Sequence, residues 1–174
     1  MSFARPDDVG PDGQTFRAAL EAYNTAEDNP FGLYEAWRLY EHSAYEQLVR
    51  QFGEEKVFIL SAGWGLVRST YRLPQYDITF SQAGGPLKKR GKRDPYCDFA
   101  QFAANECDEI HFVGGKSYIS FFLALTQGAS NRIIHYNSES PPSAPGCRLK
   151  RFQTTRRTNW HYDCAAALSE AGRR

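Results

Sequence analysis

The sequence predicts an α/β protein built around a mainly parallel sheet. Three short apolar runs, at residues 56–60, 109–113 and 132–136, have the length and the β-branched and aromatic content of buried strands. Helical segments lie between them, and strands that alternate with helices favour a parallel sheet covered by helices. The 174 residues are enough to bury a sizeable core. We expect a flexible N-terminal tail over residues 1–14 and a single α/β domain over residues 15–174.

Helices are expected before the first strand. Thr15–Tyr23 is a short candidate. Apolar residues recur at spacings of three and four over Phe31–Phe52, which predicts one amphipathic helix or two helices that meet near His42-Ser43. Asp28-Asn29-Pro30 is expected to cap this helix, because proline suits a first helical turn. Gly53 is expected to end it.

Three further helices are expected, over Phe99–Cys107, Tyr118–Gln127 and Trp160–Glu170. The first two lie on either side of the second strand in the sequence. Residues 137–146 are mostly Ser, Pro and other turn formers, so we expect a loop there.

Charge and composition narrow the classes of function. The net charge is +1, so only local basic patches could attract nucleic acid. No run of about 18 apolar residues is present and the N-terminus has no apolar signal core, so we expect a cytoplasmic protein without a membrane partner. We predict no cofactor and no metal, although a zinc site that includes His111 or His161 is an alternative. It would use the cysteines, which form no C-x-x-C pair and are expected to be free thiols: Cys97, Cys107, Cys147 and Cys164.

The most informative stretch for function is Phe58–Val67. Its apolar run ends in small residues, and Gly63 and Gly65 lack the Cβ that would prevent a close approach of the backbone to another group. In open α/β sheets, ligands bind at the carboxyl ends of strands. We therefore predict that Ser61, Gly63 and Trp64 contact a substrate; a purely structural turn is the alternative.

Tyr76 and Asp77 lie in an expected extended segment that follows this stretch. An acid flanked by aromatic and apolar residues is expected to be partly buried, where it can act as a general acid or base. We predict Asp77 and Tyr76 as catalytic residues. In the alternative, Asp77 caps a turn or pairs with an arginine such as Arg68.

A second glycine turn follows the strand at 109–113 and opens a helix. Backbone N–H groups at such a place bind anions, and paired glycines allow close approach. The first glycine of a P-loop is absent, since residue 110 is Ile, which excludes that class of nucleotide site. A tight turn with its lysine in solvent is the alternative to anion binding. The predicted anion-binding residues are Gly114, Gly115, Lys116 and Tyr118.

Positive charge is concentrated in two segments. Cations can bind phosphates, and aromatic rings such as those at residues 160–162 can stack on unpaired bases. A solvated loop is the alternative for each segment. The predicted nucleic-acid contacts are Lys88, Lys89, Arg90, Lys92, Arg93, Arg151, Arg156 and Arg157.

The residues 59–67, followed by Leu73-Pro74-x-Tyr76-Asp77-Ile78-Thr79, resemble the S-A-x-x-G-L … Y-D-x-T signature of small bacterial domains. These domains are related to the peroxide-stress protein YaaA and to the accessory domain of archaeosine synthase. Gly114-Gly115-x-x-Tyr118 is similar to their second strand-loop-helix. The resemblance implies a uracil-DNA-glycosylase-like fold, which is a three-layer α/β sandwich with its cleft at the strand ends. It also implies an association with nucleic acid or modified nucleobases.

Two functions are predicted. The first is a nucleic-acid- or nucleotide-associated protein of bacterial stress or defence type, which binds phosphates through basic loops beside a nucleobase-sized cleft. The alternative is an enzyme that acts on a nucleobase, nucleoside or nucleotide. In that enzyme Asp77 would be the acid or base, Tyr76 or Trp64 would stack on the base, and Gly114-Gly115-Lys116 would hold a phosphate. The expected partner is DNA, RNA or a nucleotide-like small molecule.

Overall fold

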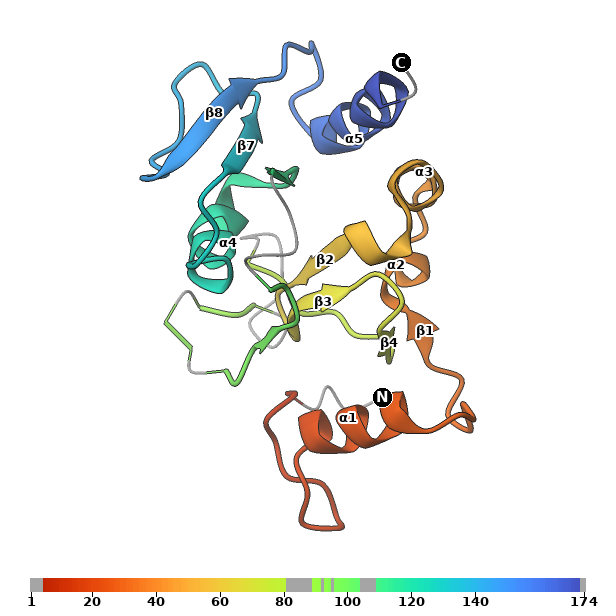
Figure 1. Cartoon of the computed structure of the whole chain (residues 1–174). Helices are drawn as coiled ribbons and strands as arrows, with labels where there is room; N and C mark the ends of the chain where they lie inside the picture. Colours follow the sequence, from red (N-terminus) through yellow and green to blue (C-terminus); the bar gives the residue numbers. More distant parts are fainter. Residues whose placement is uncertain (1–4, 81–88, 92, 95, 104–108, 173–174) are drawn as a thin grey trace.

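The computed structural model describes residues 5–80, 89–91, 93–94, 96–103 and 109–172. The described chain is a mixed α/β protein (Figure 1). Its helices are α1 (Phe16–Thr25), α2 (Ala36–Leu39), α3 (Ser43–Phe52), α4 (Ile119–Leu125) and α5 (Trp160–Ala171), with 3₁₀ turns at Glu54–Lys56 and Lys116–Tyr118. Its strands are β1 (Tyr34–Glu35), β2 (Phe58–Ser61), β3 (Gly65–Arg68), β4 (Arg72–Leu73), β5 (Phe99–Ala100), β6 (Ile110–Phe112), β7 (Arg132–Tyr136) and β8 (Cys147–Arg151).

The described strands form three small sheets rather than one central sheet. β1 pairs antiparallel with β4. β2 pairs antiparallel with β3, which pairs parallel with β5. β6, β7 and β8 form a wholly parallel sheet in that order. The prediction of an α/β protein with parallel strands is therefore confirmed, whereas the strands do not join into a single sheet.

Several predicted elements are confirmed. The strands expected at 109–113 and 132–136 are β6 and β7, and the strand expected at 56–60 is β2, which begins two residues later. The helices expected near residues 15, 118 and 160 are α1, α4 and α5. Thr15 caps α1, because its hydroxyl accepts a hydrogen bond from the Ala18 N–H at 3.1 Å.

Of the two arrangements expected over Phe31–Phe52, the one with two helices that meet near His42-Ser43 is confirmed. β1, α2 and α3 occupy this range, with the break between the helices at residues 40–42. Asp28-Asn29-Pro30 does not cap a helix, because the Asn29 amide bonds both the N–H and the carbonyl of Leu33, at 2.8 and 2.9 Å, and closes a turn there. Gly53 does end α3, with a φ of +89° that favours glycine.

The prediction of a helix over Phe99–Cys107 is wrong at residues 99–100, which form β5. Residues 104–107 of this prediction lie outside the described residues. Phe99 and Ala100 form β5 because the backbone of β3 offers partners: the Phe99 N–H donates to the Trp64 carbonyl at 2.8 Å. The Gln101 N–H donates to the Leu66 carbonyl at 2.9 Å. Tertiary pairing thus overrides the local helical pattern.

Part of the segment expected to form a tail, residues 1–14, makes contacts with the rest of the domain. Pro6 is buried, and Asp7 forms a 2.7 Å ion pair with Arg17 of α1. Val9 bridges Thr15. These contacts place residues 6–9 on the domain.

Two apolar cores flank β2. One is formed by Leu20, Ala36, Ile59, Trp64, Val67 and Leu73, and the other by Phe112, Ile119, Phe122 and Ile134. Because successive residues of a strand point to opposite faces, Ile59 joins the first core while Leu60 packs against the second. β2 therefore connects the N-terminal elements to the parallel sheet.

α5 packs against α3 (Figure 1). The rings of His42 and Tyr162 stack beside this contact, with centroids 3.6 Å apart. β8 is the outer strand of its sheet and is exposed from Arg148 onward. None of the helices within the described ranges has the length and apolar character needed to cross a membrane.

Candidate functional site

The turn between β2 and β3 is held by the hydroxyl of Ser61. Its Oγ accepts hydrogen bonds from the N–H groups of Gly63 and Trp64, at 3.2 and 3.0 Å. It also accepts one from the phenol of Tyr76 at 2.6 Å, and the Tyr76 hydroxyl is in turn bonded to that of Tyr40. Ser61 has no exposed surface, so its hydroxyl oxygen accepts these bonds inside the protein and is not accessible to a ligand.

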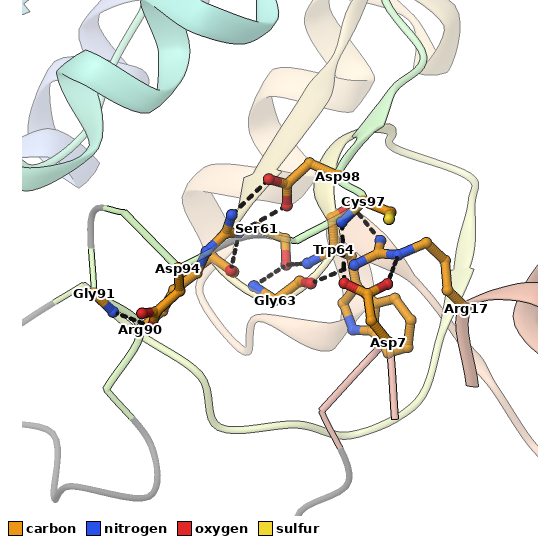
Figure 2. Close-up of polar contacts among 11 residues, drawn as sticks. Asp7, Arg17, Ser61, Gly63, Trp64, Arg90, Gly91, Asp94, Cys97 and Asp98 are labelled. Atoms are coloured by element: carbon orange, nitrogen blue, oxygen red, sulfur yellow. Dashed lines mark hydrogen bonds and ion pairs between the residues drawn. The ribbon is translucent and has the colours of Figure 1, made fainter. Parts of the chain in front are cut away.

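Two buried arginines hold the carbonyl groups of the same turn from two sides (Figure 2). Arg90 donates to the Ala62 carbonyl at 2.8 Å. Arg17 donates to the Trp64 carbonyl at 3.1 Å, and its guanidinium also lies over the rings of Trp64 and Phe99. Each of these backbone oxygens thus has a charged donor from a distant part of the chain.

Each arginine is neutralised by a carboxylate. Arg90 makes a two-point contact with Asp98, with N–O distances of 2.7 and 2.6 Å. Arg17 pairs with Asp7, whose second oxygen accepts from the Cys97 N–H at 3.0 Å. The buried charges are therefore paired and hydrogen-bonded, as burial requires.

Protein atoms fill the space beside the two glycines of this turn, Gly63 and Gly65. A Cβ on Gly63 would lie 3.2 Å from the Ile78 side chain and 3.3 Å from the Tyr76 ring. A Cβ on Gly65 would lie 2.3 Å from the Phe99 carbonyl oxygen. The close approach that the sequence predicted is real, but β5 and the segment at 76–78 occupy the space. The contacts of Ser61, Gly63 and Trp64 are therefore those of a purely structural turn, which was the alternative to substrate binding.

Tyr76 and Asp77 point to different environments. Burial raises the pKa of the Tyr76 phenol, although its hydrogen bonds to Ser61 and Tyr40 act in the opposite direction. Asp77 is exposed, contrary to the expectation of partial burial. Neither residue lines the two cavities described below. The predicted catalytic pair is thus not assembled around either of these two cavities.

A small cavity lies at the carboxyl ends of β6 and β7. Gly114 and Lys116 follow β6, and Asn137 and Ser138 follow β7, so the cavity occupies the position where parallel sheets bind ligands. Its volume is about 70 Å³. The full lining is Gly114, Lys116, Ile119, His135, Tyr136, Asn137, Ser138, Pro142 and Trp160.

Two of the four predicted anion-binding residues, Gly114 and Lys116, line this cavity. Lys116 is exposed at its rim. Gly114 is required by packing, because a Cβ there would lie 2.8 Å from the ring of Phe112. Gly115 and Tyr118 are not among the lining residues; the Tyr118 ring packs on Phe80, with centroids 5.0 Å apart.

His135 is the buried polar side chain of the cavity, with 3% of its surface exposed. Its Nε2 lies 3.0 Å from Nδ1 of His111, whose other ring nitrogen lies 2.6 Å from a carboxylate oxygen of Glu109. Glu109 also pairs with Arg148 of β8. A chain of polar contacts therefore runs from the basic strand to the cavity.

The histidine chain predicts an acid-sensitive fold. Burial, and then the charges of His111 and Lys150, lower the pKa of His135 from 6.5 to about 4, and Glu109 acts weakly in the opposite direction. The folded protein then binds fewer protons than the unfolded chain between these values, so stability present above pH 6.5 is lost as the pH falls toward 4. The loss is at most about 3 kcal/mol.

Urea unfolding at pH 7.5, 5.5 and 4.5 measures this effect, with His135→Gln as the comparison. We expect a flatter pH dependence in His135→Gln than in the wild type. His161, whose pKa burial also lowers, supplies part of the slope that remains. Equal slopes for the two proteins would contradict the assignment.

The basic residues fall into three groups. Lys88 and Lys92 lie outside the described residues, whereas Lys89 and Arg93 are exposed. Arg90 is corrected from a surface contact to an interior residue, because it is 6% exposed and bound to Asp98. The C-terminal group is exposed: Arg148, Lys150, Arg151, Arg156 and Arg157.

The C-terminal basic group adjoins the cavity. Tyr136 of the cavity wall pairs in register with Arg151, and its carbonyl accepts from the Phe152 N–H at 2.7 Å. The Asn137 amide donates to the Arg156 carbonyl at 3.2 Å. We name the exposed residues Lys150, Arg151, Arg156 and Arg157 the basic rim.

A second hollow, of about 500 Å³, is wide and open. Its amides are already used: Asn24 bonds the backbone of Arg72, and Gln101 accepts from the Arg68 N–H at 2.9 Å. Its lining is Glu21, Asn24, Thr25, Arg68, Thr70, Tyr71, Arg72 and Gln101. We therefore take the smaller cavity, beside the basic rim, as the candidate site.

The sequence-based predictions missed His135 and Asn137 as site residues. Strand periodicity offered one signal, since His135 interrupts an apolar run, and Asn137 directly follows the strand end. Within the described ranges, no three His, Cys, Asp or Glu side chains are grouped as metal ligands, and Cys97, Cys147 and Cys164 are free thiols. No family model matches the chain, and neither a curated protein nor a solved structure matches it.

Proposed function

We propose that this protein binds nucleic acid or a nucleotide through its phosphates, at the basic rim and the cavity beside it. The observation that carries the proposal is that the basic rim is hydrogen-bonded to the wall of the cavity. Hydrogen bonds tie the segment that bears Arg151 and Arg156 to the cavity wall at Tyr136 and Asn137. Cations grouped at the end of a parallel sheet are suited to phosphate ligands.

The charges of the rim are available to a ligand. The side chains of Lys150, Arg151 and Arg157 are exposed, and no hydrogen bond or ion pair joins these side chains to another described residue. Arg156 is held by Asp163 at 3.3 Å, an exposed pair that adds little to stability. Three cations at least can therefore exchange counterions for phosphates.

The aromatic residues argue for phosphate rather than base recognition. Trp64 is 4% exposed and Trp160 is 8% exposed, so neither ring offers a face for stacking. Binding that depends on cations alone reads no base sequence. We therefore expect low sequence preference. We also propose that the protein is related to the YaaA-related domains and has a uracil-DNA-glycosylase-like sandwich fold. The motifs at residues 59–67 and 73–79 support this proposal.

A salt titration with matched variants tests the proposal. Fluorescence anisotropy of labelled single strands and duplexes is recorded from low to moderate salt. The test variant is Lys150→Gln/Arg151→Gln/Arg157→Gln. Because each lost phosphate contact lowers the slope of log K against log salt by about 0.7 to 0.9, we expect the slope to fall by about 2 to 3 and the affinity at least about tenfold.

The control is Arg38→Gln/Arg50→Gln/Lys56→Gln, which removes the same charge from exposed positions on other elements. It should change the affinity less than about twofold, because overall charge alone steers weakly at moderate salt. Absence of binding at low salt, or equal losses in both variants, would overturn the proposal.

A further inference from the structure

The size of the cavity restricts what part of a nucleic acid can enter it. A cavity of about 150 Å³ admits benzene. The present one, of about 70 Å³, is half that size and has no room for a nucleobase. It has room for a compact group such as phosphate, and its entrance is marked by the exposed Lys116.

The polar groups of the cavity suit an anion. Lys116 carries a full positive charge at the rim. Asn137 uses its side-chain nitrogen for the Arg156 carbonyl and retains a second N–H. His135 is 3% exposed, and its Nδ1 makes no hydrogen bond with any described residue.

The His111 contact determines whether His135 can donate. When His111 holds protons on both nitrogens, one is donated to Glu109 and the other to Nε2 of His135. The proton of a neutral His135, a residue of the cavity lining, then resides on Nδ1, which has no hydrogen-bond partner among the described residues.

We propose that the cavity binds the terminal phosphomonoester of a nucleic acid strand, whose internal phosphates lie along the basic rim; this inference rests on the proposed function. An internal phosphodiester has chain on both sides and only two free oxygens, so it fits a cavity of this small size less well. A terminal phosphate has a single attachment, three free oxygens and a charge between −1.5 and −2. The protein would thus distinguish strand ends.

Competition binding tests the inference. Unlabelled oligonucleotides of one sequence displace a labelled strand; they carry a 5′-phosphate, a 3′-phosphate or only hydroxyl ends. We expect one of the two phosphates to tighten binding about tenfold over the hydroxyl ends, in line with the gain from charge-assisted hydrogen bonds. The arm that shows the gain identifies the end that enters the cavity.

Two variants test whether the tighter binding of the phosphate-ended strand comes from the cavity. Lys116→Gln, at an exposed position, should remove most of the preference for the phosphate, so that the three strands bind with affinities within about twofold of one another. Arg157→Gln should weaken all the strands by the same factor. Equal affinity for all ends, or a preference that survives Lys116→Gln, would overturn the inference and leave the proposed function intact. Failure of every strand to bind at low salt would overturn both.

Discussion

Gly65→Ala is expected to prevent stable folding. The φ of Gly65 is +100°, which L-residues with a side chain rarely adopt. The added Cβ would lie 2.3 Å from the carbonyl oxygen and 2.5 Å from the nitrogen of Phe99. Both are backbone atoms of β5, so they cannot move aside as a side chain would.

The cost combines backbone strain with the loss of the β3–β5 pairing. We expect the free energy of unfolding to fall by at least about 4 kcal/mol, which is nearly all the stability of a domain at the lower end of the usual range of about 5 to 15 kcal/mol. Circular dichroism and urea unfolding measure it. The control is Gly32→Ala, which also has a positive φ, +60°, but has no atom within 4 Å of the added Cβ.

Gly32→Ala should cost only about 1 to 2 kcal/mol, since it has the strain without the collision. The difference between the two variants isolates the contact with Phe99. A Gly65→Ala protein with near wild-type stability would show that β5 does not lie against this turn.

The elements that the sequence predicted well are those with strong local patterns. Residues 132–136 form a run of β-branched and aromatic residues that ends in a polar loop, and it is β7. β8 was missed because four of its five residues are exposed and three of these are basic, a composition that indicates a loop. As the outer strand of its sheet it pairs on one side only, and charged residues are common on such edges.

The site shows a similar limit. The sequence correctly placed glycine turns after β2 and β6, and a cavity does lie beside the second. It could not show that Arg17 and Arg90 would fill the first turn, because the partners are 47 and 28 residues apart in the chain. A run of basic residues also gives no indication of which member turns inward. That depends on Asp98 and on the rings of Tyr96, Phe80 and Phe121 around the guanidinium of Arg90.

Arg90→Met is expected to lower the free energy of unfolding by about 3 to 5 kcal/mol, because it leaves a buried charge without its partner. The Asp98 side chain is 11% exposed and would lose both of its hydrogen bonds with the guanidinium. The Ala62 carbonyl would lose its charged donor. Urea unfolding near neutral pH measures the loss.

Two further variants separate the pair from its surroundings. Arg93→Met, at an exposed position three residues away, should change stability by less than about 0.5 kcal/mol. Arg90→Met/Asp98→Leu should recover much of the loss, since an apolar pair in place of a buried ion pair is often neutral and the rings around residue 90 accept a thioether. If Arg90→Met and Arg93→Met both had small and equal effects, Arg90 would be an exposed residue rather than a buried one. A double variant no more stable than Arg90→Met would show that the Ala62 carbonyl, rather than Asp98, is the partner on which this turn depends.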